Sequence, residues 1–340
     1  ASDWSSDVCS SDLIVRQAKR VLETLLIDEL KSGRVELREI EGLTLENRLE
    51  KGEAVPQDVL AAIKECDVLL KGPTTTPQGA NTLGSANVKI RRELDLYANV
   101  RPVKVPELGI DWCFFRENTE GEYALGGDGI EIPDKLSMDF KVTTDAGTRR
   151  IARAAFEYAR NNGKTRVAIV TKNNVIKKTD GNFSRICHEV AADYPEITAA
   201  DYIADIVTAS LIDPYRQKDY EVFVLPNLYG DIITDEAAQL QGGVGTAGSA
   251  NLGDQYAMFE AIHGSAPRKI ENGEGDYANP ASILKAAELL LRHISMPEKA
   301  DSLATAMRLC TESERRVVVT GHRDGATCQE FGDYLLETLL

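Results

Sequence analysis

Hydrophobic positions along this chain follow two periods, and segments with one period alternate with segments of the other. Apolar residues spaced three and four apart predict amphipathic helices. The helical segments are 14–31, 56–66, 85–97, 144–162, a stretch that ends near 193, 281–294, 298–310 and 330–340. Short apolar or alternating runs predict strands, and these runs are 35–40, 67–70, 112–115, 166–171, 202–205 and 222–225. The alternation predicts an α/β fold with a parallel or mixed sheet.

Two segments depart from this alternation. Residues 126–142 contain Gly, Pro and short alternating runs, so they predict a hairpin-like excursion rather than a helix. Residues 1–13 are rich in Ser and Asp and follow no helical or strand period, which is typical of a disordered tail.

A pair of acidic residues follows the last predicted strand. Asp231 and Asp235 are four residues apart in a helical pattern, which places their Cβ atoms about 5–6 Å apart on one helix face. Two carboxylates this close need a cation, and oxygen ligands suit Mg²⁺ or Mn²⁺. Alone, such a pair more often marks a hydrated helix surface. Asp205, at the end of the segment 202–205, is a third carboxylate of the same kind.

Basic residues are candidates for binding an anion. Arg91, Arg101 and Arg116 fall close together in an acidic chain. Guanidinium groups match carboxylates and phosphates in a bidentate geometry, so the three arginines are a candidate clamp, although ordinary surface ion pairs explain them equally well. Lys172 and Lys177 lie in a loop, where a buried lysine would act as an acid or base and an exposed one needs no function.

Composition limits the possible partners. The 340 residues suffice for two domains, and the net charge of −15 argues against nucleic acid or an anionic membrane as a partner. No apolar run is long enough to span a membrane and no secretory signal is evident. Six cysteines without a C-x-x-C spacing predict reduced thiols and a cytoplasmic protein.

Two glycine-containing loops could approach a nucleotide. Residues 243–248 match the G-x-G-x-x-G pattern, but they follow a helix instead of a strand, so they are not a dinucleotide-binding fingerprint. His263 lies in a loop that continues to Arg268 and Lys269. That loop could cradle a nucleotide, and a lone histidine at such a corner is more often structural.

Five separated motifs, taken together, carry a family resemblance. They are Lys71-Gly-Pro with the threonines that follow, RRELDLYANVRP at 91–102, FRENTEGEY at 115–123, NLYGD at 227–231 and HGSAP at 263–267. In this order they resemble the isocitrate and 3-isopropylmalate dehydrogenases, metal-dependent decarboxylating enzymes, and most closely the isocitrate dehydrogenases. The likeness runs from about residue 14 to the end of the sequence.

The resemblance implies a role for each matching residue. Tyr123 and Lys177 would transfer protons, and Asp205, Asp231 and Asp235 would bind Mg²⁺ or Mn²⁺. The residues implied in holding substrate are Ser85, Asn87, Arg91, Arg101 and Arg116. The residues implied in holding cofactor are Lys71, Thr75, Thr76, Glu260, His263, Gly264, Ser265, Ala266, Pro267, Arg268, Lys269 and Asn279.

Two local features decide between substrates and between cofactors. Ser85 and Asn87 resemble the polar residues with which isocitrate enzymes bind a substrate carboxylate. An isopropyl group at this place would leave these polar groups without hydrogen bonds, at a cost of about 1–3 kcal/mol for each group. Arg268 and Lys269 replace the acidic residue of NAD-dependent relatives, so we expect NADP, with NAD as the alternative and with His322 or Arg323 as further phosphate ligands.

The resemblance also implies an assembly and a domain plan. It implies a homodimer with shared sites, in which Lys177 and Asp205 act across the interface. It implies one domain from 1–97 and 242–340 on the cofactor side, and another from 98–241 that includes a clasp at about 122–141. A eukaryotic source would make the compartment the mitochondrial matrix.

One departure from the family lies at the N-terminal end. The family opens with an apolar strand and a glycine-rich loop, and residues 1–13 show neither. We therefore expect a defective first strand and a gain of stability when the usual opening is restored. Alternative functions are 3-isopropylmalate or homoisocitrate dehydrogenase, or a non-catalytic regulatory subunit; the presence of Tyr123, Lys177 and the three aspartates favours catalysis.

Overall fold

A computed structural model describes residues 10–77, 82–126, 128–264 and 272–339. Its centre is an eight-stranded mixed sheet with the strand order β1-β10-β9-β2-β3-β8-β6-β7. The strands are β1 (Val68–Lys71), β2 (Ala98–Val105), β3 (Ile110–Glu117), β6 (Arg166–Thr171), β7 (Thr198–Ile203), β8 (Val222–Leu225), β9 (Gly248–Leu252) and β10 (Ala257–Ala261). The α/β fold expected from the sequence is confirmed.

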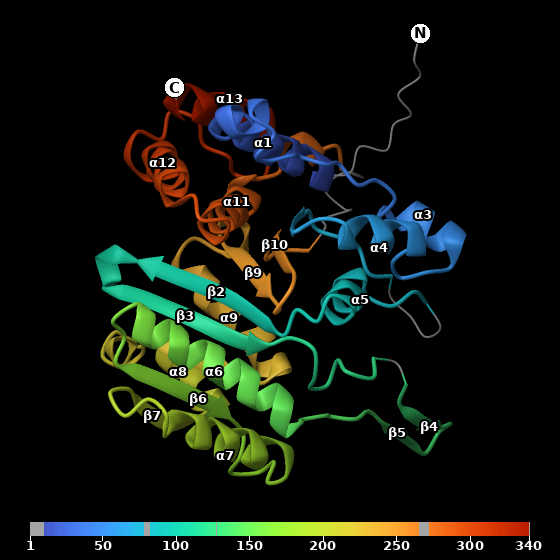
Figure 1. Ribbon diagram of the computed structural model, residues 1–340, viewed down its shortest axis with the longest axis vertical. Helices are drawn as coiled ribbons and strands as arrows, with labels where there is room; N and C mark the ends of the chain where they lie inside the picture. Colours follow the sequence, from blue (N-terminus) through green and yellow to red (C-terminus); the bar gives the residue numbers. More distant parts are fainter. Residues whose placement is uncertain (1–9, 78–81, 127, 265–271, 340) are drawn as a thin grey trace.

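Helices cover both faces of this sheet (Figure 1). The helices are α1 (Ser10–Leu25), α2 (Ile27–Lys31), α3 (Leu45–Lys51), α4 (Gln57–Lys64), α5 (Ala86–Glu93), α6 (Asp145–Asn161), α7 (Thr179–Ala191), α8 (Ala204–Leu211), α9 (Asn227–Leu240), α11 (Ala281–His293), α12 (Pro297–Arg308) and α13 (Cys328–Leu339). None of the helices in the described part of the chain is long and apolar enough to cross a membrane.

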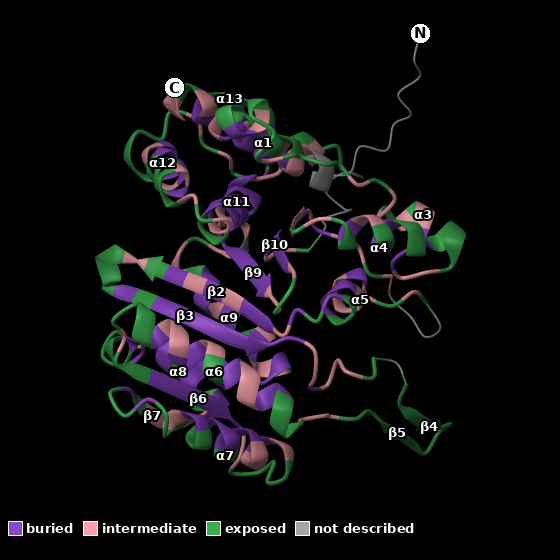
Figure 2. Ribbon diagram, viewed as in Figure 1, coloured by how far each residue is buried: buried purple, intermediate pink, exposed green. Residues whose placement is uncertain are grey.

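Successive side chains of the central strands point to opposite faces of the sheet, so they pack into two separate cores. Cys113 and Phe115 of β3 pack with α6 and α7 on one face, whereas Trp112 and Phe114 pack with α8 and α9 on the other. Successive strand residues point to opposite faces, so a strand buried on both sides must be apolar throughout. Figure 2 shows these strands and the inner sides of the covering helices as buried.

A third core lies at the other end of the sheet. Helix α11 packs on β9 and β10, and α1, α12 and α13 add an outer layer that includes Leu22, Leu303 and Leu335. Helix α1 contacts α13, so segments from both ends of the described chain lie side by side (Figure 1). The sheet continues across the domain boundaries implied at residues 97 and 242. Strand β9, from the implied cofactor-side domain, pairs with β2, from the other implied domain. The two-domain division stays a prediction.

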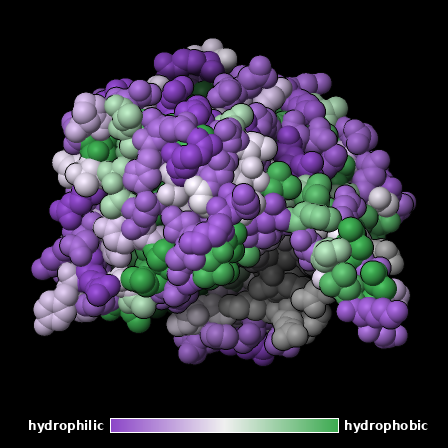
Figure 3. All heavy atoms as spheres, turned by 90° about the horizontal axis from the view of Figure 1, so that it is seen from below, coloured by the Kyte–Doolittle hydropathy of each residue, from purple (hydrophilic) through white to green (hydrophobic). Residues whose placement is uncertain are grey.

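The excursion forms the small hairpin β4 (Ile130–Ile132) and β5 (Leu136–Met138), which projects from the molecule with both strands exposed (Figure 2). Its exposed apolar residues are Ile130, Ile132, Leu136, Met138 and Phe140. Figure 3 shows apolar surface gathered on the side where the hairpin projects in Figure 1. Hydrophobic side chains exposed in this number are typical of a surface that another chain covers.

Several sequence predictions were wrong in detail. Residues 35–40 form no strand; Arg38 and Glu39 instead make ion pairs with Glu65 and Lys19. Alternation alone cannot supply a neighbouring strand, so the segment lies on the surface. The helix expected over 85–97 ends at Glu93 because the chain turns at Asp95, which has a positive φ of 49°.

Strands β2, β9 and β10 were not predicted. β9 reads Gly-Ser-Ala-Asn-Leu, a composition with low strand propensity. It forms a strand because α11 packs closely against it: a Cβ atom on Gly248 would lie 2.5 Å from the backbone nitrogen of Ala286. The expectation of a missing first strand concerns residues 1–13, of which residues 1–9 lie outside the described part; α1 begins at Ser10.

Candidate active site

The site begins where β8 ends and α9 begins. The buried strand Val222–Leu225 leads through Pro226 into α9, whose first turns carry Asp231 and Asp235. Between them and the strand, Gly230 provides space for Arg116: a Cβ atom at Gly230 would lie 2.4 Å from Cγ of Arg116. The glycine of the NLYGD motif therefore lets a buried arginine from β3 lie across the helix.

Arg116 makes the closest polar contacts with α9. Its Nε and Nη2 donate to Oδ1 of Asn227 at 3.0 and 2.7 Å, and its Nη1 donates to Asp231. Burial lowers the pKa of Arg116 to about 9, so the guanidinium keeps its charge at neutral pH. On the other side of the same carboxylate, the hydroxyl of Tyr123 donates to Oδ2 of Asp231 at 3.0 Å.

The proton of Tyr123 is held firmly. Burial and the negative charge of Asp231 raise its pKa to about 12. The phenol is therefore protonated at neutral pH, as a general acid must be. This geometry brings the predicted proton-transfer residue, a predicted metal ligand and a predicted substrate ligand into direct contact.

Arg101 of β2 joins the second aspartate. Its Nη1 donates to Thr234 Oγ1 at 2.5 Å and to Asp235 Oδ1 at 3.2 Å, while Nη2 lies 3.7 Å from Oδ1 of Asp231. Burial tends to raise the pKa of Asp231, but Arg116 and Arg101 outweigh it and lower that pKa. Burial, with help from Asp231, raises the pKa of Asp235.

The two aspartates fit a divalent cation only in part. They supply carboxylate oxygens one helical turn apart, and the Asp235 side chain is 56% exposed, so an ion can reach it. Among the described residues, no group of three or more acidic, His or Cys side chains is arranged to hold a metal. To hold a metal ion, Asp231 and Asp235 would therefore need a further ligand from elsewhere.

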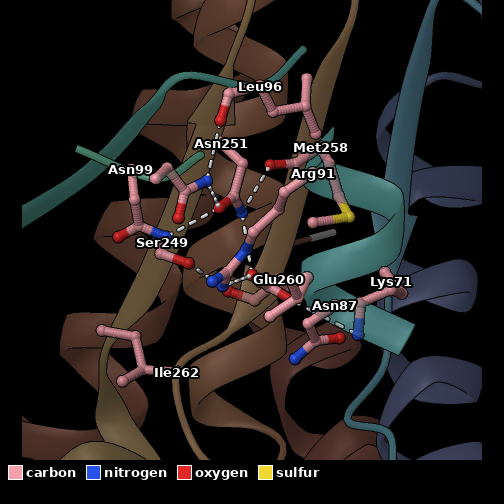
Figure 4. Close-up of polar contacts among 12 residues, drawn as sticks. Lys71, Asn87, Arg91, Leu96, Asn99, Ser249, Asn251, Met258, Glu260 and Ile262 are labelled. Atoms are coloured by element: carbon pink, nitrogen blue, oxygen red, sulfur yellow. Dashed lines mark hydrogen bonds and ion pairs between the residues drawn. The ribbon is translucent and has the colours of Figure 1, made fainter. Parts of the chain in front are cut away.

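A second polar cluster surrounds Glu260 of β10 (Figure 4). Arg91 of α5 binds Glu260 Oε1 through Nη2 at 2.7 Å, and Nζ of Lys71 lies 3.3 Å from Oε2. All three side chains are buried. Burial alone would raise the pKa of Glu260, but the charges of Arg91 and Lys71 hold it at about 2.

One cavity extends from the Glu260 cluster to Arg101 of the first cluster. It is lined by Lys71, Pro73, Thr74, Asn87, Arg91, Arg101, Ser249, Glu260, Ala261, Ile262, His263 and Gly264. The sequence assigned some of these residues to substrate and others to cofactor, and the fold brings the two sets together. In the described part of the chain, the buried Nε of Arg91 has no hydrogen-bond acceptor, which favours an anionic ligand in this cavity.

Lys177 and Asp205 lie outside this cluster. Lys177 is exposed in the loop between β6 and α7, and Asp205 makes an ion pair with Lys172. Both follow parallel strands whose carboxyl ends share a sheet edge with β8, but neither contacts Asp231 in this chain. Their role in a site shared between two subunits stays a prediction.

Other predicted residues have local structural contacts. Ser85 caps α5 by accepting a hydrogen bond from the Val88 amide at 3.4 Å, and Asn279 accepts one from the Ala281 amide at 2.9 Å. The Thr75 carbonyl accepts a hydrogen bond from Arg48, and Thr76 is exposed. Nδ1 of His263 lies 3.0 Å from the Gly264 carbonyl.

Part of the predicted cofactor loop lies outside the described residues, namely Ser265, Ala266, Pro267, Arg268 and Lys269. The segment that directly follows residue 271 contacts the two further candidates. Arg323 donates to the Asn272 carbonyl at 3.0 Å, and His322 lies 3.4 Å from Glu274.

Sequence reasoning missed four residues that hold the site in place. Asn227, Asn99 and Asn251 contact Arg116, Arg101 and Glu260, respectively. Arg48 is fully buried and donates to the carbonyls of Ala54, Thr75 and Gly84, so it anchors both sides of the loop that leads into α5. Asn99 and Asn227 lie inside two of the quoted motifs, and this position was the only sign in the sequence that they belong to the site.

The isocitrate/isopropylmalate dehydrogenase family model matches residues 6–335. The chain belongs to this family. Among related sequences, it is 38% identical over 291 residues to the NADP form of isocitrate dehydrogenase from Rickettsia bellii, covering 82% of this chain and 58% of that protein. It is 36% identical over 284 residues to the probable mitochondrial isocitrate dehydrogenase (NAD) subunit alpha of Drosophila melanogaster, covering 82% and 73%.

Solved structures of the family have the same fold. The isocitrate dehydrogenase of Methylococcus capsulatus superposes with a TM-score of 0.86 at 31% identity, covering 97% of this chain and 96% of that one. The TT0538 protein of Thermus thermophilus gives 0.84 at 35% identity, covering 96% and 65%. The chain spans 52–58% of the length of the Rickettsia isocitrate dehydrogenases that it matches.

Proposed function

We propose that this chain catalyses the metal-dependent oxidative decarboxylation of isocitrate to 2-oxoglutarate, with reduction of NADP. The observation that carries the proposal is the convergence of Arg91, Arg101 and Arg116 on a site that also contains Tyr123 and the aspartate pair of α9. Three guanidinium groups suit a substrate with several carboxylates. Relatives that are named isocitrate dehydrogenases support the same activity.

The entrance to the cavity supports a polar substrate. Thr74 donates to Oδ1 of Asn87 at 3.0 Å, and both side chains line the cavity. The hydroxyl of Ser85, two residues before the cavity-lining Asn87, accepts from the Val88 amide and can also donate its proton to a ligand carboxylate. An isopropyl group at this place would remove polar groups from water without pairing them, so isocitrate fits better than 3-isopropylmalate.

We propose that Asp231 and Asp235 would hold the metal, with Asp205 of the partner subunit as the third carboxylate. A bound Mg²⁺ or Mn²⁺ would polarise the hydroxyl and carboxylate oxygens of the substrate. The side chain of Asp205 is 66% exposed, so it is accessible to a second subunit. Arg101 and Arg116 would then turn part of their contact from the aspartates to the substrate carboxylates.

A homodimer would supply the partner's residues. Beside Asp205 lies an apolar hollow between α8 and α9, which Ala204, Ile232 and Ile233 help to line. Ile206 of α8, Ile212 directly after α8 and Ile232 of α9 are 46%, 63% and 57% exposed. Together with the apolar hairpin β4–β5, this surface supports an interface between two copies that brings Asp205 and Lys177 to the other subunit's site.

The protein groups divide the proton transfers. Lys177 of the partner subunit would take the proton from the substrate hydroxyl, and bound NADP would supply the hydride acceptor. After carbon dioxide leaves, the carbon that carried it needs a proton. Tyr123 holds one beside Asp231 and would deliver it from its phenol oxygen.

We expect Lys177→Met to lower kcat by about 10²–10⁴-fold, the usual range for a lost acid–base group. The KM for isocitrate should change little, because the three arginines remain. Steady-state kinetics with saturating Mn²⁺ measure both constants. Lys178→Met, at the adjacent exposed lysine, is the matched control and should keep its turnover. A normal kcat for Lys177→Met would remove this lysine from the mechanism.

We expect Arg268→Asp to shift cofactor preference from NADP toward NAD. A carboxylate would repel the 2′-phosphate and accept hydrogen bonds from the ribose hydroxyls. The kcat/KM for NADP divided by the kcat/KM for NAD should fall by roughly ten- to a hundredfold, because one hydrogen bond to a charged group contributes about 1.5–3 kcal/mol. Arg315→Asp, at an exposed arginine, is the control. An unchanged ratio for Arg268→Asp would contradict the cofactor proposal.

The whole proposal is tested by the absorbance of reduced nicotinamide. The purified chain is mixed with isocitrate or 3-isopropylmalate, with NAD or NADP, and with or without Mn²⁺. Isocitrate, NADP and Mn²⁺ together should give the fastest reduction. Reduction only with 3-isopropylmalate would correct the substrate, and no reduction with either acid would defeat the proposed activity.

A further inference from the structure

Two buried asparagines connect the two clusters of the candidate site. Asn251 donates through Nδ2 to Glu260 Oε1 at 2.9 Å, and its Oδ1 accepts from Nδ2 of Asn99 at 2.7 Å. Oδ1 of Asn99 accepts from Nε of Arg101 at 2.8 Å. The labelled part of this chain, from Glu260 through Asn251 to Asn99, is visible in Figure 4. It joins a residue near the cofactor side to a residue that contacts the metal carboxylates.

The direction of this hydrogen-bond chain is fixed at both ends. The ionised carboxylate of Glu260 can only accept, and the guanidinium of Arg101 can only donate. Each amide between them must therefore point its nitrogen toward Glu260 and its oxygen toward Arg101. An amide can do both at once, whereas a carboxylate or a hydrocarbon of the same size cannot.

The sheet holds the two asparagines opposite each other. Asn99 of β2 and Asn251 of β9 are direct partners in the antiparallel register, and both are fully buried. Directly opposed residues have Cβ atoms about 4.5–5.5 Å apart, so short amide side chains meet without strain. A second donor, Nδ2 of Asn118, reaches Oδ1 of Asn251 at 2.9 Å and further fixes the orientation of that amide.

The ends of the chain control the substrate ligands. Glu260 holds Arg91 by its 2.7 Å ion pair, and Arg101 reaches both aspartates of α9. A shift of either amide would change the position of one arginine relative to the other. Two arginines that grip different carboxylates of one small molecule must keep a fixed separation.

We propose that Asn99 and Asn251 are positioning residues that set the spacing between Arg91 and Arg101 for the substrate carboxylates. The inference deepens the proposed function and rests on it. Neither asparagine lines the cavity, so both act through Glu260 and Arg101 without touching the ligand.

The test replaces each amide by a carboxylate of the same shape. In Asn251→Asp, the oxygen that replaces Nδ2 faces Glu260 and repels it. In Asn99→Asp, the contact with Arg101 remains but the donor to Asn251 is lost. Asn251→Asp should raise the KM for isocitrate by roughly ten- to a hundredfold, since a lost hydrogen bond to a charged group costs about 1.5–3 kcal/mol. Asn99→Asp should raise it by roughly two- to tenfold, since the lost amide–amide bond contributes about 0.5–1.5 kcal/mol. Asn99→Asp, which does not touch Glu260, should change the KM for NADP less than twofold. Asn251→Ala and Asn99→Ala serve if an aspartate variant does not fold.

Gln217→Glu is the matched control. Gln217 is also buried, and its Nε2 donates to the Leu211 carbonyl at 2.7 Å, outside the chain of hydrogen bonds. It undergoes the same change from amide to acid and should lose stability with the KM for isocitrate unchanged. If the Asn99 and Asn251 variants keep the wild-type KM, or if Gln217→Glu raises the KM equally, the positioning role is overturned.

A second measurement separates this inference from the proposed function. The carboxylate introduced in Asn251→Asp should raise the folded pKa of Glu260 toward its unfolded value. The folding free energy that Glu260 loses on acidification should therefore be smaller than in the wild type, and the loss should be complete at a higher pH. A wild type that does not oxidise isocitrate defeats the proposed function. An unchanged acid transition in Asn251→Asp overturns the positioning chain whatever the activity.

Discussion

Asp231→Asn should lower kcat by about 10²–10³-fold, the usual cost of removing one preorganised electrostatic group from an active site. The change removes a carboxylate that accepts hydrogen bonds from both Arg116 and the Tyr123 hydroxyl. An asparagine can accept only through one oxygen, so it cannot keep both contacts and bind a cation. Activity measured against Mn²⁺ concentration should show a much weaker metal response than the wild type.

The same variant should also be less stable. Arg116 is almost completely buried, and breaking a buried ion pair by removing one partner costs about 3–5 kcal/mol. Partial exposure of Asp231 places the expected cost at the lower end of this range. Asp219→Asn, at an exposed aspartate, is the control for both measurements. Full activity of Asp231→Asn at wild-type Mn²⁺ levels would show that the metal and the proton donor lie elsewhere.

Glu260→Gln should reduce the free energy of unfolding near neutral pH by about 3–5 kcal/mol, because Arg91 and Lys71 would then lie buried without their counter-charge. In the wild type, the contribution of Glu260 to the free energy of unfolding depends on pH. The folded pKa of about 2 lies below the ordinary value of a glutamate, so the stabilisation is present above the ordinary pKa. It is lost as the pH falls from about 4 to about 2.

The measurement is urea unfolding at several pH values. The wild type should lose about 3 kcal/mol across this acid range through Glu260, and the glutamine variant should lack that part of the slope. Glu107→Gln, at an exposed glutamate, should retain the wild-type slope. Equal acid slopes for Glu260→Gln and the wild type would contradict the pairing of Glu260 with Arg91 and Lys71.

Most of the elements could be predicted from the sequence because their signals are local. The amphipathic patterns over 144–162 and 281–294 correspond to α6 and α11, and the buried run at 222–225 corresponds to β8. Strand β9 could not be predicted, because its small and polar residues form a strand only through their neighbours β10 and β2 and the close packing of α11. The expected strand over 35–40 was wrong because periodicity carries no information about an available partner.

The candidate site divides in the same way. Arg116, Tyr123 and Asp231 could be named from motifs, and the fold places them in contact. The pairing of Arg91 with Glu260 could not, because 169 residues separate them along the chain. The strand order that puts β1, β10, β9 and β2 next to one another creates this contact and the line of amides beside it.

The sequence by itself determined the family and the chemical identity of the charged groups, because both are written in short motifs. The tertiary structure alone decided which charge pairs with which, and hence that Glu260 has a pKa near 2 while burial and Asp231 raise that of Asp235. It also decided that Asp205 pairs with Lys172 within one chain, whereas Asp231 and Asp235 pair with Arg116 and Arg101. A pKa and a ligand set depend on burial and on distance through space, and neither quantity follows from spacing along the sequence.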